Sequence, residues 1–227
     1  MKDLAQQMAG VSIEIYSDVI CPWCYIGKRR LERALERLGG AVKAQIAWRP
    51  FQLNPTMPKE GMERRRYLEE KFGSLNSFRP IEQQVLEAGA AEGISFAFGK
   101  MTRTPNTFLA HRMIWYGGRQ GVQDAVVTSL FRGYFEEGVD IGSVPALMQL
   151  SERAGLDAGP LLRSEDGTAE VNAEEVEGHR LGIRAVPYFV VNRAYGISGA
   201  QPAERFLSVI ERVTADPPIE TGLATER

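Results

Sequence analysis

The sequence predicts an α/β fold that is interrupted by a large all-helical insertion. Strand and helix patterns alternate near the N-terminus, a long run of helical patterns follows, and strand patterns return before the last helix. Alternating strands and helices are typical of a parallel sheet with helices packed on its faces. We therefore expect residues 11–58 and 179–214 to form one domain, and residues 59–178 to form the helical insertion.

The first elements predicted are a strand, a helix and a second strand. Residues 12–16 alternate around two isoleucines, and a helical pattern begins at Pro22 and stops at two glycines, 39 and 40. Residues 42–48 have the length and alternation of another strand, which Pro50 ends. This order predicts that the two strands are parallel neighbours in a βαβ unit.

The insertion is predicted from consecutive helical segments that are separated by glycine or proline. The expected helices lie near Arg64–Phe72, Ile81–Glu92, Thr107–Tyr116, Gln123–Phe135, Val144–Ala154 and Ala173–Leu181. Strand character returns at residues 188–191, and a turn at Asn192-Arg193 leads to a hairpin partner at 195–198. A last helix is expected from Pro202 to Val213, and residues 215–227 are expected to be a disordered tail.

Composition excludes several classes of function. The chain has 227 residues, 25% of them charged, and a net charge of −2 with acidic and basic residues interspersed. No strongly basic face is implied, so nucleic acid is not an expected partner. The sequence contains no apolar run of the ~18 residues that a membrane span needs. The N-terminus also lacks the apolar stretch of a secretory signal, so we expect a cytoplasmic location. The oligomeric state is left open.

The two cysteines, Cys21 and Cys24, are the strongest functional signal. Thiol–disulfide exchange needs a thiolate nucleophile and a second thiol that resolves the mixed disulfide. A helix N-terminus favours the thiolate through its unpaired N–H groups and its dipole, and Pro22 suits the first helical position. We expect Cys21 to be the exposed, attacking thiol and Cys24 to be the more buried, resolving thiol.

Two other interpretations of the cysteine pair were weighed. A half zinc site would need two further ligands, and His111 and His179 are the only histidines and have no paired spacing. Two unreactive thiols, buried for packing, would not need to flank Pro22-Trp23 at a helix start. We therefore expect no bound metal. Trp23 cannot carry positive charge, so we expect a less oxidising pair than one with histidine in that position.

Three segments resemble the DsbA-like oxidoreductases, especially the FrnE-like group. The first segment is residues 13–27, which contain Cys21-Pro22-Trp23-Cys24. The second is residues 182–191, which contain Val186-Pro187, and residues 197–202 continue it. The third, within the insertion, is Pro105-Asn106-Thr107 with Ala110-His111. The resemblance therefore extends from the first strand to the last helix and stops before the tail.

The resemblance implies a thioredoxin fold with a large all-helical insertion, and an enzyme that exchanges electrons with protein or small-molecule disulfides. It implies that Pro187 follows a cis peptide bond and lies across from Cys21, although an X–Pro bond is trans by default. The backbone of Val186 would pair with an extended substrate. Beyond the redox-active Cys21–Cys24 disulfide no cofactor is expected to be bound, and glutathione is a candidate reductant.

Other positions carry weaker predictions. The thioredoxin fold often keeps a buried acid near the resolving cysteine, and Glu14 takes that role if the turn before Cys21 contains an extra residue. Glu14 would then relay a proton to or from Cys24, but a paired strand glutamate is an equally good interpretation. For Asn106 a substrate-binding role competes with capping of a helix, which we favour. We expect His111 to be a satisfied packing residue.

Three functions are compatible with these signals. The leading one is disulfide exchange at Cys21 and Cys24. The second is a glutathione-dependent isomerase or transferase, because the 2-hydroxychromene-2-carboxylate isomerases and kappa-class glutathione transferases look similar in layout. Those enzymes use serine where this chain has Cys21, which argues against that class. The third is a non-enzymatic module that holds partner peptides.

Overall fold

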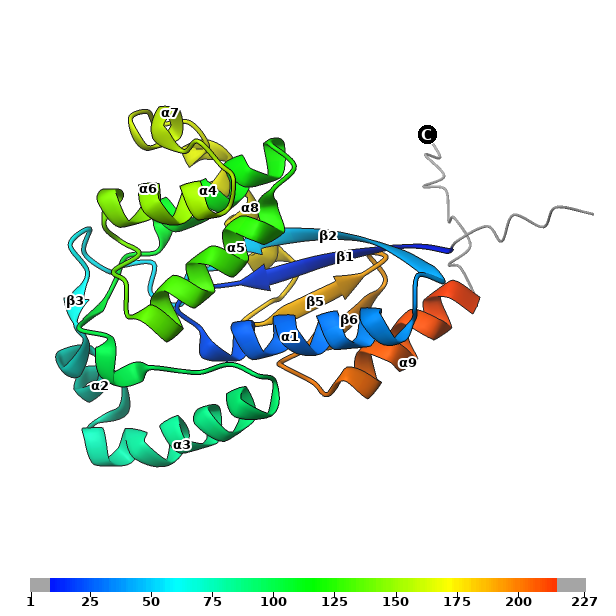
Figure 1. Ribbon diagram of the computed structural model, residues 1–227, viewed down its shortest axis with the longest axis horizontal. Coiled ribbons are helices and arrows are strands. Elements are labelled where there is room, and N and C mark those ends of the chain that lie inside the picture. The colour runs from blue at the N-terminus through cyan, green and yellow to red at the C-terminus, as the bar shows by residue number, and fades with distance from the viewer. Residues whose placement is uncertain (1–8, 216–227) are drawn as a thin grey trace, which may run out of the picture.

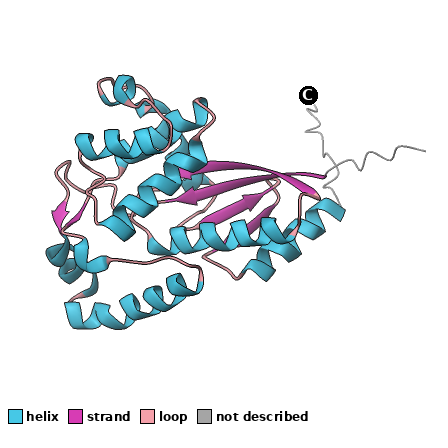
Figure 2. Ribbon diagram, in the orientation of Figure 1, coloured by secondary structure: helices cyan, strands magenta, loops and turns pink. Residues whose placement is uncertain are grey.

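The structure is a computed structural model, and it describes residues 9–215. A four-stranded sheet at its centre has the order β2-β1-β5-β6 (Figures 1 and 2). β1 (Ala9–Ser17) and β2 (Val42–Pro50) are parallel, whereas β5 (Tyr188–Val191) runs antiparallel to β1 and forms a hairpin with β6 (Tyr195–Ser198). The predicted βαβ unit and the predicted hairpin are therefore both confirmed.

Two helices cover one face of the sheet and a third covers the other. α1 (Pro22–Arg37) and α9 (Ala203–Ala215) pack together over the buried side chains of Ile13 and Ile15 in β1. α8 (Thr168–Arg180) covers the opposite face, where a Cβ at Gly178 would lie 2.7 Å from the Tyr16 ring. Alternate residues of β1 therefore face different helices.

The chain between β2 and β5 is mostly helical, as predicted. Its elements are β3 (Met62–Glu63), α2 (Arg64–Phe72), α3 (Leu75–Ala91), η1 (Phe98–Lys100), β4 (Arg103–Thr104), α4 (Phe108–Arg119), α5 (Gln123–Arg132), η2 (Gly133–Glu137), α6 (Val144–Arg153), α7 (Gly159–Leu162) and α8. The expectation of an entirely helical insertion needs one correction, because β3 and β4 form a two-stranded ribbon. Strands of two residues are too short to show an alternating pattern.

Several helix boundaries also differ from the prediction, because glycine and proline do not always end a helix. α3 begins at Leu75 rather than Ile81, with Pro80 inside it and the Ser74 hydroxyl capping the Ser77 N–H. α4 continues through Gly117, where a Cβ would lie 2.9 Å from Val126 of α5. The glycine therefore allows two helices to pack closely.

Part of the prediction falls outside the described residues. The expected disordered tail lies there except for Ala215, which is the last residue of α9. The proposed division of the chain at 58/59 and 178/179 stays a prediction, and α8 runs across its second boundary. Within residues 9–215, no helix has the length and apolar character that crossing a membrane requires.

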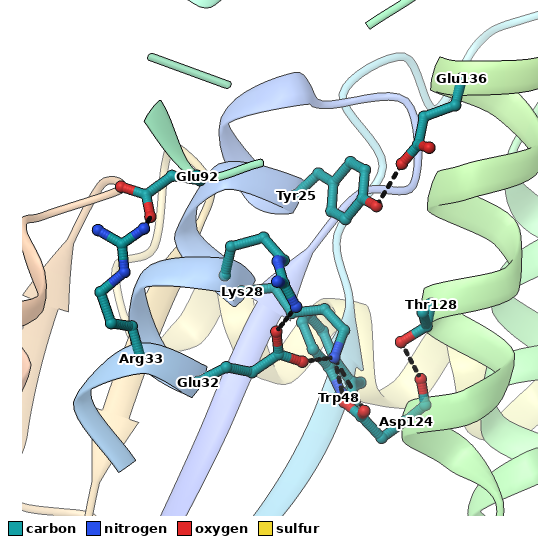
Figure 3. A network of polar contacts seen from close by, with 10 residues as sticks. Tyr25, Lys28, Glu32, Arg33, Trp48, Glu92, Asp124, Thr128 and Glu136 are labelled. Carbon is teal, nitrogen blue, oxygen red and sulfur yellow. Dashed lines mark hydrogen bonds and ion pairs between the residues drawn. The ribbon is translucent and has the colours of Figure 1, made fainter. Parts of the chain in front are cut away.

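Polar contacts, which Figure 3 shows, and aromatic contacts fix α1 against the insertion. The Lys28 ammonium is buried and contacts both carboxylate oxygens of Asp124 at 2.8 and 2.9 Å, and it also pairs with Glu32. The Tyr25 hydroxyl donates to Glu136 at 2.6 Å, and the Tyr25 ring stacks on Phe131 with 5.0 Å between centroids. These contacts hold the helix that begins at the cysteine pair.

Candidate active site

Cys21 and Cys24 occupy the N-terminus of α1, as predicted. Cys21 is the N-cap residue with an extended backbone, and Pro22 is the first helical residue. The Cys21 N–H donates to the Asp18 carbonyl at 3.0 Å, and the Cys24 N–H donates to the Cys21 carbonyl at 3.0 Å. Both cysteines are free thiols in the structure. The turn Ser17–Ile20 therefore fixes the position of the first cysteine.

The prediction that Cys21 is exposed was wrong. The residue is 5% exposed and Cys24 is 1% exposed, because the insertion packs over the start of α1. Cys21 does line a cavity of about 260 Å³, together with Pro22 and Trp23. The other side chains of this lining are mostly apolar and come from the turn before Cys21, the segment after β2, α2, α3, η1 and η2. The cavity gives the first cysteine a route to a ligand.

Val186 and Pro187 lie beside the first cysteine. The Cys21 Sγ is 3.7 Å from the Val186 carbonyl oxygen, a distance at which a thiol donates a hydrogen bond. The Val186–Pro187 peptide bond is cis in the structure. Gly27 of α1 lets this loop approach, because a Cβ there would lie 3.1 Å from the Pro187 ring and 3.1 Å from Phe189. The segments of the first two sequence signatures therefore meet at one place.

Burial raises the pKa of the Cys24 thiol well above its ordinary value, and the neighbouring Cys21 thiol raises it further. The Ser17 hydroxyl and the Asp18 backbone N–H act in the opposite direction. The second cysteine is consequently protonated at neutral pH, and a reaction that uses it as a nucleophile has to remove its proton.

Asp18 and His111 are site residues that the sequence analysis missed or misjudged. Asp18 is fully buried, and its Oδ2 accepts from the Leu53 N–H at 2.7 Å. Its Oδ1 lies 3.4 Å from Nε2 of the buried His111, yet neither atom has a hydrogen-bond partner among the described residues. His111 is therefore buried but not satisfied. A signal was present, since Ser17-Asp18 directly precedes the cysteine motif and His111 belongs to a motif of the insertion.

The contacts of Glu14 and Asn106 favour one of the two interpretations of each residue. Glu14 points to the face of the sheet that α8 covers, where Arg49 donates to it at 2.7 and 2.9 Å and also pairs with Glu174. The contacts favour the paired strand glutamate over the proton relay to Cys24. Asn106 accepts from the Phe108 N–H and donates to the Met57 carbonyl, which favours capping over substrate binding.

A cluster of three or more His, Cys, Asp or Glu side chains that could hold a metal ion is absent from residues 9–215. The alternative of a half zinc site at Cys21 and Cys24 therefore gains no further ligands from the part of the chain that the structure describes.

Comparisons with known proteins agree with this geometry. A family model described as the DSBA-like thioredoxin domain matches residues 12–211. The structure is similar to that of a probable DsbA oxidoreductase from Streptomyces coelicolor, with a TM-score of 0.84 and 32% identity over 96% of this chain and 95% of the other.

Two more distant structures share the fold. The cytosolic disulfide reductase DsbM from Pseudomonas aeruginosa has a TM-score of 0.63 and 17% identity over 88% of this chain and 97% of its own, and another structure of it contains GSH. A 2-hydroxychromene-2-carboxylate isomerase has a TM-score of 0.66 and 16% identity over 89% of this chain and 95% of the other. Identities this low show a common fold and no more.

Proposed function

The chain belongs to the family of DSBA-like thioredoxin domains, and on this premise we propose that it is a thiol–disulfide oxidoreductase that works through Cys21 and Cys24. The observation that carries the proposal is the position of Cys21, which caps α1, lies 3.7 Å from the Val186 carbonyl and lines a cavity. Its substrates would be protein or small-molecule disulfides.

The proposed reaction begins at Cys21. Its thiolate attacks one sulfur of a substrate disulfide, the substrate S–S bond breaks, and a mixed disulfide forms as one substrate thiolate leaves. The Val186 carbonyl, next to Pro187, lies 3.7 Å from the Cys21 sulfur, and we propose that the backbone of an extended substrate pairs with it. The helix N-terminus contributes positive potential to the sulfur that carries negative charge in this step.

The second step uses Cys24. Its thiolate attacks the Cys21 sulfur, the mixed disulfide breaks, and the second substrate thiolate leaves, so two electrons have passed from the protein dithiol to the substrate. Because burial raises the Cys24 pKa, its proton has to be taken up, and the Ser17 hydroxyl and Asp18 N–H stabilise the anion that remains. We propose that Asp18 of this turn and His111 of α4, which face each other in the interior, assist that proton transfer.

The same steps in reverse oxidise a dithiol substrate, and the direction depends on the redox partner. We propose that glutathione, as in the redox environment of the cytoplasm, regenerates the reduced pair: two glutathione molecules would give up two electrons and become one glutathione disulfide. In this scheme no cofactor beyond the cysteine pair is bound.

Replacement of Cys24 by serine tests the proposal. Cys24→Ser should still release one substrate thiol and then stop at a mixed disulfide with Cys21, because the resolving sulfur is missing. Mass spectrometry of the trapped adduct and thiol release per protein would show this. A glutathione-dependent isomerase would be little affected by the change. Persistent turnover in Cys24→Ser, or no thiol release from the reduced wild type, would contradict the proposal.

The double variant Cys21→Ser with Cys24→Ser distinguishes an oxidoreductase from the third candidate function, a non-enzymatic module that binds partner peptides. A non-enzymatic peptide-binding module would lose no function with both sulfurs gone. An oxidoreductase would lose all exchange, while its binding of a peptide or of oxidised glutathione would persist.

A further inference from the structure

The walls of the cavity beside Cys21 are apolar and come from both parts of the fold. Trp23 stands on α1, while the facing walls come from the insertion and from the segment after β2, and include Leu53, Leu68, Phe72, Phe78, Ile81 and Phe98. Aliphatic and aromatic walls favour a ligand with a compact apolar group. The volume of about 260 Å³ equals that of about nine water molecules at ~30 Å³ each, so the cavity suits a group of the size of one ring.

Two cations, Arg64 and Lys71, are part of this largely apolar lining. Lys71 is exposed and its ammonium donates to the Tyr67 hydroxyl at 2.7 Å, whereas the half-buried guanidinium of Arg64 has no such partner among the described residues. Arg64 opens α2 as the first of three consecutive arginines, and the next two, Arg65 and Arg66, pair with Glu69 and Glu70 one turn further on. The residue one turn after Arg64 is Leu68, which forms part of the cavity wall and offers no partner.

The surroundings of Arg64 leave its guanidinium available to a ligand. It lies 5.6 Å from the centroid of the Phe98 ring, and within residues 9–215 it makes no hydrogen bond and no ion pair. Glu82, an acidic residue of the same lining, does not approach within ion-pair distance. A half-buried guanidinium without a partner suits a carboxylate, which it can bind through two parallel hydrogen bonds.

From these contacts, and resting on the proposed function, we propose that the preferred substrate is a small disulfide whose sulfur is attached to a compact apolar group that carries a carboxylate. The ring or aliphatic group would fill the cavity, the carboxylate would pair with Arg64, and the sulfur would meet Cys21. Glutathione disulfide, which is polar along its whole length, would use this cavity poorly.

The test measures single-turnover thiol release from four disulfides mixed with the reduced protein. These are the disulfides of mercaptobenzoate, mercaptobenzamide and glutathione, and hydroxyethyl disulfide. Each rate is divided by the rate of a free thiol, N-acetylcysteine, with the same disulfide, which removes differences in intrinsic reactivity. The normalised rate should be about tenfold higher for the benzoate than for the uncharged benzamide, the effect of one charge-assisted hydrogen-bond pair of ~1.4 kcal/mol. It should be lowest for hydroxyethyl disulfide.

Two variants of Arg64 and a matched control at Arg66 test whether Arg64 causes the preference for the benzoate disulfide. Arg64→Gln should reduce the benzoate-to-benzamide ratio to near one, whereas Arg64→Lys, which keeps the charge, should retain part of it. Arg66→Gln, on the same helix but exposed and paired with Glu70, should leave the ratio unchanged.

The possible failures are distinguishable. If the reduced protein reacts with none of the four disulfides faster than N-acetylcysteine does, the proposed function itself is wrong. If all four disulfides react faster to the same extent, the function stands and the substrate inference is overturned. If Arg64→Gln still reacts faster with the benzoate disulfide than with the benzamide disulfide, the proposal that Arg64 binds the carboxylate is overturned.

Discussion

Two clusters of ionisable side chains, each built around a buried residue, lie beside the cysteine helix, and they differ in how well their hydrogen bonds are satisfied. Lys28 is 3% exposed and contacts both Asp124 oxygens and Glu32, and the Trp48 indole N–H also donates to Asp124 (Figure 3). At the other cluster, Asp18 and His111 face each other at 3.4 Å and each keeps a buried polar atom without a partner.

We propose that the difference separates a structural cluster from a functional one. A fully hydrogen-bonded buried charge holds elements together, and Lys28 joins α1 to α5 and β2 in this way. A buried polar atom without a partner costs free energy, about 1–3 kcal/mol for a neutral group, so its presence needs a reason. Contact between the Asp18 turn and both cysteines supplies that reason.

Replacement of Asp18 is expected to have the largest effect. Asp18→Asn keeps the size of the side chain and removes the carboxylate that would assist loss of the Cys24 proton. Release of the first substrate thiol should keep its rate, while release of the second should slow at least about tenfold, since general acid–base assistance is typically worth ~10²–10⁴-fold.

The pH dependence of the second release sharpens this test. Because the pKa of Cys24 is raised, the wild-type rate should increase with pH through the neutral range as the thiolate fraction grows. Asp124→Asn, the matched change in the satisfied cluster, should leave both releases unaffected. If Asp18→Asn and the wild type release the second substrate thiol at equal rates, Asp18 and His111 have a structural role only.

Replacement of Lys28 should affect stability instead of exchange. Lys28→Met keeps the length of the buried side chain but leaves Asp124 without its cation, while Glu32 keeps its pair with Arg29. Breaking a buried pair costs ~3–5 kcal/mol when the remaining charge stays buried. Asp124 is 53% exposed and can be solvated, so we expect a decrease of about 1–2 kcal/mol in the free energy of unfolding.

Denaturant titration of the reduced protein measures this decrease, and thiol release per folded molecule should stay within about twofold of wild type. Arg29→Met on the exposed side of the same helix provides the control, because its pair with Glu32 is at the surface and should contribute at most ~1 kcal/mol. If Lys28→Met reduces thiol release per folded molecule by more than about twofold, the proposed distinction between the two clusters is wrong.

The smallest effect is expected from removal of the Tyr25 hydroxyl, which is hydrogen-bonded to Glu136. Tyr25→Phe removes its hydrogen bond to Glu136 and should lower the free energy of unfolding by about 1 kcal/mol at neutral pH. Burial, followed by the contact with Glu136, raises the Tyr25 pKa above its ordinary value of 10.0.

The sign of the pH effect follows from that shift. Below pH 10 the phenol is protonated in the folded and unfolded chains alike, so the contribution is fully present. Above this value the unfolded chain loses the proton first, and stability falls as pH rises. Tyr25→Phe should therefore show a shallower loss in alkaline denaturation, with the remaining slope due to groups such as Tyr134, whose pKa is also raised. An unchanged slope would contradict the assignment.

Local signals were sufficient for the cysteine pair and the strand hairpin. Pro22 fits the first helical position and the following residues repeat with helical period, so Cys21 had to lie at the helix start. Asn192 and Arg193 adopt positive φ angles of 47° and 55° in the turn that the sequence predicted between β5 and β6. In both cases the residues that determine the structure are neighbours in the chain.

The side chains around the site depended on packing between distant segments. Alternation in β1 predicts that Glu14 and Ile15 face opposite sides, but not which side α1 covers. The insertion decides the burial of Cys21 and brings His111 and Arg64 to the site, and no local pattern records such contacts.

The sequence by itself therefore determined the reactive group and the order of the elements, because helix caps, turns and periodicity act over a few residues. Only the tertiary structure decided that the Asp18 side chain is fully buried against His111 while Glu14 pairs with Arg49, and that a largely apolar cavity lined by the free guanidinium of Arg64 adjoins Cys21. These features arise where a helical insertion packs against the sheet domain. Their energies depend on burial by segments that are distant in the sequence.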